Sequence, residues 1–350
     1  WDEGVRQVYV LPAGDCHLPP WAARLDQALT GLAVRQFPSA AAWWRGTEPL
    51  ESDNECTVDR WASLAHDAAG SNKALLWVEP EAVAINRLWQ AGASRERTVR
   101  LRPDIPEWPL PQGADRQAAP ELVSNLCCIG HGDARGGNLA MAGMMLPKPG
   151  GRADEFSVFT AMRLHQIRHA QRLIMSCCAL GRIEEAQGEA LGMTALAFNF
   201  KTRVAVGAML PIPDLEGSLF FMALHFAWSR MMRCGPAETG KSRWARILQY
   251  AWSRSEQTGS PAEHKTEWAK VFHATRRTIL AGEWPEGYGA WLQTEWGGIV
   301  EALSDSLADQ RRIWLDCRDP RDGLEGALRT LASKPDERVR WVAAVTTCLG

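Results

Sequence analysis

The sequence predicts an α/β fold in which helices cover a mainly parallel β-sheet, followed by a helical C-terminal part. Two observations lead to this prediction. Apolar and β-branched runs of strand length alternate with helix-like stretches through about the first 230 residues. From about Ser218 onward the chain looks helical. The chain has 350 residues, of which 46% are hydrophobic, and this supports a sizeable core in one domain or two.

The predicted elements of the first part follow one another along the chain. The expected strands are residues 5–11, 32–37, 74–78, 123–129, 173–175 and 203–209. The expected helices are one that ends at residue 29 and those at residues 40–44, 79–91 and 156–171. Ser39 is a good N-cap for the second helix, because its hydroxyl can accept a hydrogen bond from a free backbone N–H. Residues 103–120 are rich in proline and predict an irregular connection.

The second part predicts several helices. Residues 219–233 form the first, an apolar stripe at residues 244–252 marks the second, and Trp268 begins the third. Trp314, Leu328, Leu331 and Trp341 mark later helices. We therefore expect a core at residues 1–233 and a helical extension at residues 234–350 that packs on it.

Charge and cysteine content limit the class of protein. The formal net charge is −2, so nothing indicates direct binding to nucleic acid or to an anionic membrane. No apolar stretch is long enough to span a bilayer, and no signal peptide is visible. The nine cysteines include no CxxC pair, which leaves a zinc site with little support. We expect a reduced cytoplasmic protein without a metal or other cofactor. The first residue is Trp, which suggests a fragment of a longer protein.

Two islands of the sequence carry potentially reactive residues. Residues 125–132, NLCCIGHG, are an apolar run that ends in His131 and Gly132, and residues 172–178, RLIMSCC, end in cysteine. At the ends of neighbouring strands, a thiol and an imidazole form a nucleophile and its base. Successive side chains point to opposite faces of a strand, so one of Cys177 and Cys178 can face a cleft while the other packs inside. The alternatives are a histidine that merely ends a strand and two buried cysteines.

Taken together, the chain resembles the CHAT domains, a caspase-like cysteine protease family of the clan that includes caspases, separases and gingipains. The resemblance covers most of the first 230 residues, and the blocks occur in the family's order. They are VYVLPAG (8–14) with HLPPWAA (17–23), Pro38-Ser39, CCIGHG (127–132), LIMSCC (173–178) and VAVGAMLPIPD (204–214). Leu210, Lys201 and Ala179-Leu180 depart from the family's usual residues.

The resemblance implies a fold and a set of site residues. The fold would be a caspase-like three-layer α/β/α sandwich. Cys178 would be the nucleophile and His131 its acid and base, with the backbone N–H groups of Gly132 and Cys178 forming an oxyanion hole. Asp214 would bind a basic side chain, as a matching aspartate does in separases, and Asp133 is a weaker candidate for specificity. The alternative for Asp214 is a cap on the helix that begins near Leu215.

The resemblance also implies a biological role. Such domains are regulated endopeptidases of bacterial antiviral defence or cell death, with gasdermins or CRISPR-associated proteins as substrates. They are usually joined to a sensor or repeat domain, which here would lie outside this chain. The first alternative is an inactive caspase-like interaction module.

A P-loop nucleotide switch is a further alternative, because residues 235–242, GPAETGKS, fit the pattern GxxxxGK[ST]. The residues before this motif predict a helix and not a buried strand, so a loop with Ser242 as a helix cap is the simpler interpretation. His165 and His169 are spaced as a zinc-binding pair on a helix would be, although no third ligand is evident.

Overall fold

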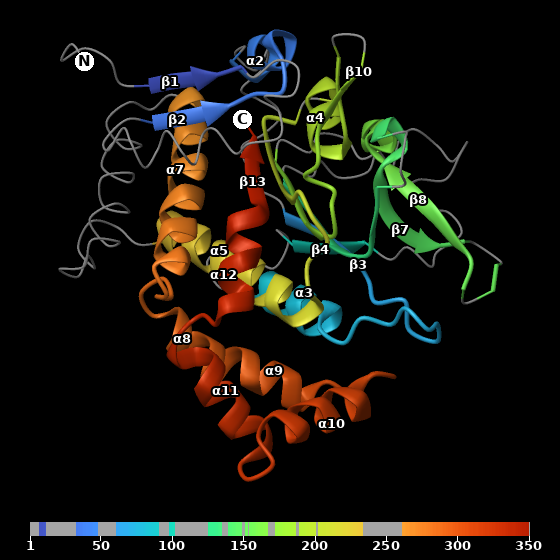
Figure 1. The fold of residues 1–350 in the computed structure, drawn as a ribbon, viewed down its shortest axis with the longest axis vertical. Helices are drawn as coiled ribbons and strands as arrows, with labels where there is room; N and C mark the ends of the chain where they lie inside the picture. Colours follow the sequence, from blue (N-terminus) through green and yellow to red (C-terminus); the bar gives the residue numbers. More distant parts are fainter. Residues whose placement is uncertain are drawn as a thin grey trace.

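A six-stranded sheet forms the centre of the protein (Figure 1). The computed structural model describes residues 7–11, 33–47, 61–90, 98–101, 125–134, 139–148, 151–152, 154–166, 172–186, 189–200, 202–233 and 261–349. The strand order is β13-β12-β9-β5-β3-β4. The bounds are β3 (Trp61–His66), β4 (Thr98–Leu101), β5 (Asn125–Gly130), β9 (Arg172–Cys177), β12 (Val204–Ala208) and β13 (Thr346–Leu349). All neighbours pair in parallel except β13, which is antiparallel to β12. The predicted α/β class with a mainly parallel sheet is confirmed.

Side chains that alternate along the central strands enter two separate cores. Cys127 and Ile129 of β5 point into one core, and Leu126 and Cys128 point into the other. The first core lies under α3 (Val78–Gln90), α5 (Asp214–Arg233), α7 (Pro261–Leu280) and α12 (Glu337–Val345). The second core includes residues of α2 (Ala40–Thr47), β7 (Gly143–Pro147), β8 (Phe156–Thr160), η4 (Ala161–Gln166) and α4 (Met193–Ala197). Both faces of the sheet are therefore covered, as a buried parallel sheet requires.

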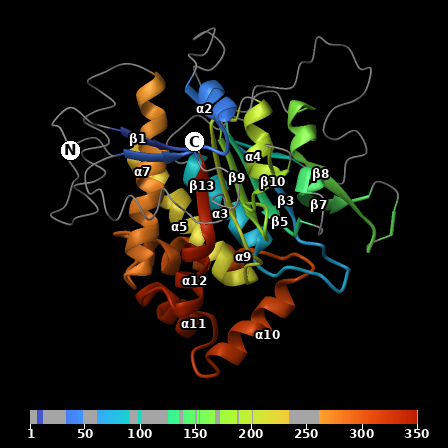
Figure 2. The same cartoon turned by 45° about the horizontal axis from the view of Figure 1, so that its top comes forward.

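Smaller sheets lie around the central one. A parallel pair joins β1 (Gln7–Val10) to β2 (Ala33–Gln36), and Figures 1 and 2 both show α7 passing beside it. An antiparallel sheet joins β6 (Gly132–Asp133), β7 and β8. A short hairpin joins β10 (Glu184–Ala186) to β11 (Glu189–Leu191).

The C-terminal helices gather below the sheet in Figure 1. They are α8 (Tyr288–Trp291), η7 (Leu292–Trp296), α9 (Gly297–Ala302), α10 (Ala308–Arg318) and α11 (Gly323–Ser333). Tyr288 and Trp296 are fully buried in the same core as α3 and α5. The chain then returns through α12 and ends in β13, so the part expected to be helical also contributes an edge strand to the central sheet.

Several predicted elements are confirmed with small shifts of their ends. They are β1, β2, α2, α3, β5, β9 and β12. The helices α5 and α7 are also confirmed, but they begin five and seven residues before the expected starts at residues 219 and 268. The Ser39 hydroxyl accepts a hydrogen bond from the backbone N–H of Ala42 at 3.1 Å, which confirms the cap of α2. The helix ending at residue 29, the connection at 103–120, the stripe at 244–252 and the P-loop-like residues 235–242 lie outside the described residues.

Two predicted elements are wrong. Residues 74–77 are not a strand but the turn that leads into α3, because their backbone groups bond elsewhere: the N–H of Leu75 donates to the carbonyl of Asp67 at 2.7 Å. Residues 156–160 are not helical, because they pair as β8 with β7, and the following helix is the 3₁₀ turn η4. The strand beside β5 is β3, which the sequence analysis missed.

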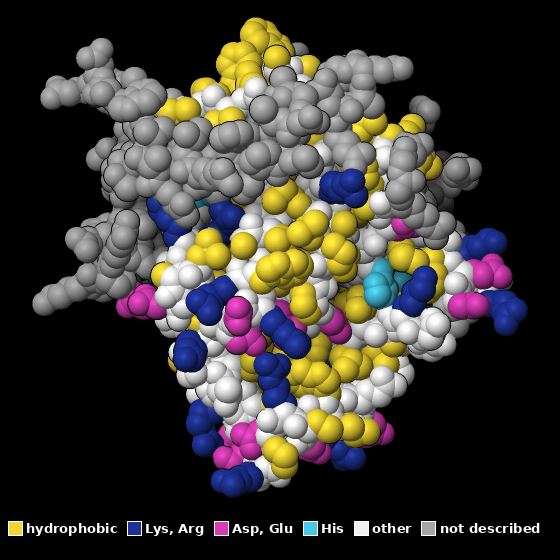
Figure 3. Space-filling view, in the orientation of Figure 1, with side chains coloured by type: hydrophobic (Ala, Val, Ile, Leu, Met, Phe, Trp, Pro, Cys, Tyr) yellow, Lys and Arg dark blue, Asp and Glu magenta, His cyan; other side chains and the backbone are white. Residues whose placement is uncertain are grey.

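The visible surface carries charges of both signs. Figure 3 shows lysine and arginine interspersed with aspartate and glutamate around a band of hydrophobic side chains. Within the described ranges, no helix combines the length and the apolar character needed to cross a lipid bilayer.

Candidate active site

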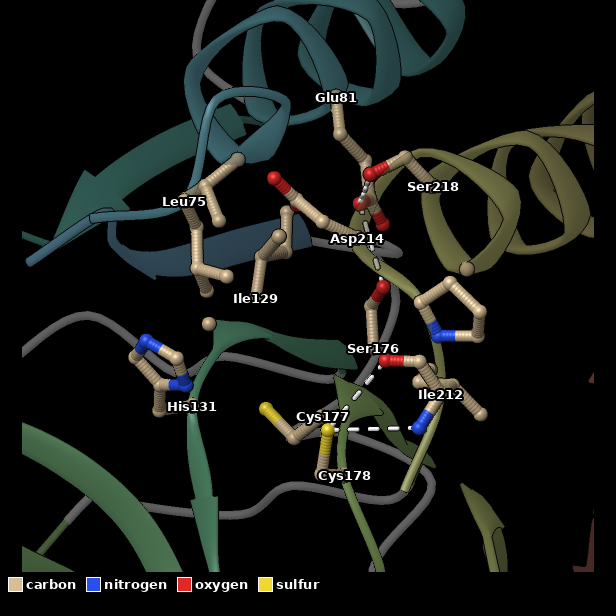
Figure 4. A pocket seen from close by; sticks show the side chains of 14 residues that line it. Leu75, Glu81, Ile129, His131, Ser176, Cys177, Cys178, Ile212, Asp214 and Ser218 are labelled. Atoms are coloured by element: carbon tan, nitrogen blue, oxygen red, sulfur yellow. Dashed lines mark hydrogen bonds between the residues drawn. The ribbon is translucent and has the colours of Figure 1, made fainter. Parts of the chain in front are cut away.

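His131 and Cys178 meet at one edge of the central sheet. In the parallel pair β5–β9, Gly130 lies opposite Cys177, so the next residue of each strand is His131 on one and Cys178 on the other. Both side chains line the same pocket at the carboxyl ends of the strands (Figure 4). This is the edge at which parallel sheets hold their ligands. The sequence placed both residues at strand ends, and the register of the two strands brings them together.

Gly132 brings the two strand ends into close backbone contact. A Cβ atom at Gly132 would lie 1.9 Å from the carbonyl oxygen of Cys178, so no larger residue fits without a shift of backbone. Directly after Cys178, Ala179 has φ +57°, a left-handed conformation that costs energy for a residue with a Cβ. Such strain is often found where a side chain must be aimed at a functional site.

The Cys178 thiol is half-buried and held by the backbone of one neighbouring residue. Its Sγ lies 3.4 Å from the N–H of Ile212 and 3.5 Å from the carbonyl oxygen of the same residue. Burial raises the pKa of this thiol, Asp214 raises it further, and the hydrogen bond from Ile212 lowers it. The resting group is therefore a protonated thiol that needs a base to become nucleophilic.

Cys177 has a different environment from its neighbour. Its side chain is 1% exposed and packs in the second core, with its Sγ 3.5 Å from the carbonyl oxygen of Cys128. Burial raises the pKa of Cys177 well above its usual range. Of the two adjacent thiols, only Cys178 combines partial exposure with contact to the backbone of Ile212.

The imidazole of His131 is oriented by the turn before α3. Its Nε2 atom forms a hydrogen bond with the backbone carbonyl of Lys73. Because a carbonyl can only accept, Nε2 must carry a proton, and in the neutral ring the lone pair then lies on Nδ1. No hydrogen bond joins His131 to Cys178, although the structure describes both side chains. The pair is thus set up with a free basic nitrogen but without a resting ion pair.

Asp214 lines the pocket, and its carboxylate is engaged with backbone. Oδ2 accepts a hydrogen bond from the N–H of Leu76 at 2.6 Å, and the N–H of Trp77 also donates to this side chain. These donors precede α3, so Asp214 caps the beginning of α3 although it is itself the first residue of α5. The sequence offered a cap on the helix that begins near Leu215 as the alternative role of Asp214, and the hydrogen bonds of its side chain go to the turn before α3 instead. Burial raises the pKa of Asp214 to about 6.

Asp133 ends the short strand β6 and is not among the described residues that line the pocket. The sequence analysis instead missed Glu81, which lines it from α3. Glu81 accepts hydrogen bonds from the hydroxyls of Ser176 at 3.1 Å and Ser218 at 2.7 Å. Burial raises the pKa of this carboxyl to about 8.

A signal for Glu81 is present in the sequence. Val78, Ile85 and Leu88 share one helical face with Glu81, and all four side chains are buried. A carboxylate at a position of an apolar stripe is expensive unless it has a function or partners. Among the described residues, no group of three histidine, cysteine or acidic side chains is arranged to hold a metal ion. His165 lies in η4, and His169 is outside the described residues.

The chain is similar to known proteins in structure and not in sequence. No protein-family profile matches the chain, and no curated protein matches its sequence. Among solved structures, the chain is similar to the complex of Porphyromonas gingivalis RgpB pro- and mature domains, with a TM-score of 0.41 and 10% sequence identity. The similarity covers 77% of this chain and 63% of the RgpB chain, so it spans less than two thirds of that protein.

Proposed function

We propose that the protein is a cysteine endopeptidase in which Cys178 is the nucleophile and His131 transfers the protons. One observation carries this proposal: the residues that follow two paired strands are a partly exposed cysteine and a histidine with a free ring nitrogen, and both line one pocket. We also propose that the substrate is a protein and that a regulatory domain outside this chain controls access, as the resemblance to CHAT domains implies.

The proposed reaction is acyl transfer in two stages. The Cys178 thiol gives its proton to Nδ1 of His131 while its sulfur attacks the carbonyl carbon of the scissile bond. The tetrahedral intermediate then collapses, the C–N bond breaks, and His131 gives the proton to the leaving amine. Water, deprotonated by His131, attacks the resulting thioester, which releases the acid and restores the thiol.

The oxyanion of the intermediate needs donors close to the nucleophile. We propose the backbone N–H groups of Gly132 and Cys178 for this role, because Gly132 lies against the backbone of Cys178, the residue that carries the sulfur. The strained backbone at Ala179 is consistent with a fixed orientation of the Cys178 amide.

Covalent labelling tests this proposal. A peptide acyloxymethyl ketone, which alkylates catalytic cysteines, should add one mass increment to the wild type, and the adduct should map to Cys178 by peptide mass spectrometry. Cys178→Ala should abolish labelling, whereas the matched control Cys177→Ala should retain it because that thiol is buried. Labelling that persists in Cys178→Ala would place the nucleophile elsewhere, and an unlabelled wild type would favour the inactive interaction module.

A further inference from the structure

The candidate site has a second end, away from the sulfur and the imidazole. The pocket that begins at Cys178 and His131 ends at two acidic side chains, Glu81 and Asp214 (Figure 4). Its walls are apolar, with Leu75 on one side. An apolar channel that ends in carboxyl groups matches a long side chain that is hydrocarbon along its stem and cationic at its tip, as in lysine and arginine.

The two carboxyl groups are not equivalent. Asp214 is committed to the backbone N–H groups of Leu76 and Trp77, and its charge also interacts with the guanidinium of Arg311. It already has the partners that a buried carboxylate needs. Asp214 therefore stabilises the wall of the pocket, since the turn whose backbone it binds also carries Leu75.

Glu81, in contrast, has one oxygen without a partner. Both hydroxyls, those of Ser176 and Ser218, donate to Oε2. Oε1 is buried and has no hydrogen-bond partner among the described residues. The side chain is 1% exposed and lines the pocket, so Oε1 is a buried polar atom at the pocket's inner end. Buried polar atoms without a partner are rare and call for a specific explanation, such as a ligand that completes the site.

We infer that Glu81 selects the substrate: its Oε1 receives the cationic group of a lysine or arginine side chain on the residue that precedes the scissile bond, while Asp214 holds the wall of the pocket in place. This inference rests on the proposed function, because it takes the sulfur of Cys178 as the point of attack. It assigns the specificity role differently from the expectation from sequence, which gave that role to Asp214.

The charge balance of the empty pocket agrees with this inference. Burial raises the pKa of Glu81 to about 8, so at neutral pH the empty pocket holds a protonated Glu81. A cation that enters favours the ionised form, so Glu81 releases its proton to solvent as the ion pair forms. The preference for a cationic substrate should therefore strengthen as pH rises towards 8.

Matched substrates test the inference. Three fluorogenic peptides that differ only in the residue before the scissile bond, with arginine, lysine or the uncharged citrulline, are compared by kcat/KM. The wild type should prefer a cationic residue over citrulline by at least about 100-fold, as expected for a buried charged hydrogen bond. Glu81→Gln keeps the acceptor for the two serines but removes the carboxylate that pairs with the cation, so it should reduce this preference at least about tenfold. Glu79→Gln, on the same helix and outside the pocket lining, is the control.

A second measurement needs no variant. In the wild type, the ratio of kcat/KM for arginine to that for citrulline should rise between pH 6 and pH 8, and Glu81→Gln should flatten this rise. A preference that survives in Glu81→Gln but disappears in Asp214→Asn would overturn the inference, as would equal cleavage of all three peptides. Either result leaves the proposed function intact if cleavage still requires Cys178. Absence of Cys178-dependent cleavage and labelling would instead refute the proposed function.

Discussion

The part of the chain that the structure describes contains two thiol–imidazole pairs, and of these two the pair at the sheet edge is placed for chemistry. In the first core, the Sγ of Cys127 lies 3.5 Å from Nε2 of His225, which is a direct contact. At the edge of the sheet, Cys178 and His131 share a pocket without a hydrogen bond between them. The pair in closer contact is thus the one that no substrate can reach, because Cys127 and His225 are at most 1% exposed.

The hydrogen bond on the far side of each imidazole also differs. The indole N–H of Trp89 donates to Nδ1 of His225 at 3.1 Å. Because an indole can only donate, Nδ1 is the acceptor and Nε2, which faces the thiol, carries the proton. The carbonyl of Lys73 imposes the opposite arrangement on His131, whose second nitrogen is left free to accept a proton.

Burial completes the difference between the two pairs. It raises the pKa of Cys127 well above its usual range and lowers the pKa of His225 to about 3. A proton transfer between them would create two charges among the rings of Trp61, Trp89 and Trp228. The comparison teaches that contact between a thiol and an imidazole does not make a nucleophile. Access and the correct tautomer matter more.

The largest expected effect separates the two histidines. His131→Ala should lower kcat for a cleaved peptide by about 10²–10⁴-fold, the usual contribution of a general acid and base. His225→Gln should keep kcat within a few-fold, because glutamine can still accept from Trp89 and nothing in that pair touches the pocket. Steady-state kinetics checks both variants. A large loss of kcat in His225→Gln with unchanged folding would contradict the assignment.

The buried histidines of the first core region, His225 and His273, should instead control how the free energy of unfolding depends on acidic pH. His225 and His273 both have a pKa lowered to about 3 by burial, against 6.5 as the ordinary value. The unfolded chain therefore binds protons that the folded chain does not, and the free energy of unfolding should fall as pH drops below about 6.5. Each histidine contributes up to about 1.4 kcal/mol per pH unit. Glu81 acts in the opposite sense, since its raised pKa makes stability fall as pH rises from about 4.5 to 8.

A difference between variants isolates the histidine contribution. We expect urea unfolding between pH 7.5 and pH 4.5 to show a smaller loss of unfolding free energy in His225→Gln than in the wild type. The difference should equal the contribution of one histidine, up to about 1.4 kcal/mol per pH unit. Equal pH dependence in the two proteins would show that His225 takes up its proton in the folded state.

The sequence predicted the two strands that carry the site and the edge of the sheet at which they end. The apolar runs before His131 and Cys178 are long enough to be read as buried strands, and the rule that ligands gather at carboxyl ends of parallel strands then places both residues at one edge. The preference for Cys178 over Cys177 came from the resemblance, and the alternation along a strand agrees with their different burial.

Other parts depend on contacts that no local pattern reveals. The run at residues 74–78 has the composition of a strand, but the carboxylate of Asp214, 138 residues further along the chain, binds its backbone and holds it as a turn. β3 was missed because Trp61–His66 contains alanine and serine, whose weak strand preference is overridden by burial between β4 and β5. The role of Glu81 likewise depends on Ser218, 137 residues away.

The smallest expected effect concerns the turn that orients His131. Arg311 of α10 is 1% exposed and donates from Nη1 to the carbonyl of Leu76 at 2.9 Å, and its Nη2 donates to Asp305. Leu76 lies three residues after Lys73, whose carbonyl fixes the tautomer of His131. A residue of α10, 235 residues further along the chain, thus stabilises the turn that orients His131. Among the described residues, no hydrogen bond links α10 to Cys127 or His225.

Arg311→Lys keeps the charge but cannot form the two-pronged contact of a guanidinium, so the turn should loosen and kcat should fall about three- to tenfold. The exposed neighbour Arg312→Lys on the same helix is the control and should change neither kcat nor stability measurably. A fall in kcat at a temperature where circular dichroism shows the variant to be fully folded distinguishes positioning of the turn from simple loss of folding. An unchanged kcat together with a lower melting temperature would assign Arg311 to stability alone.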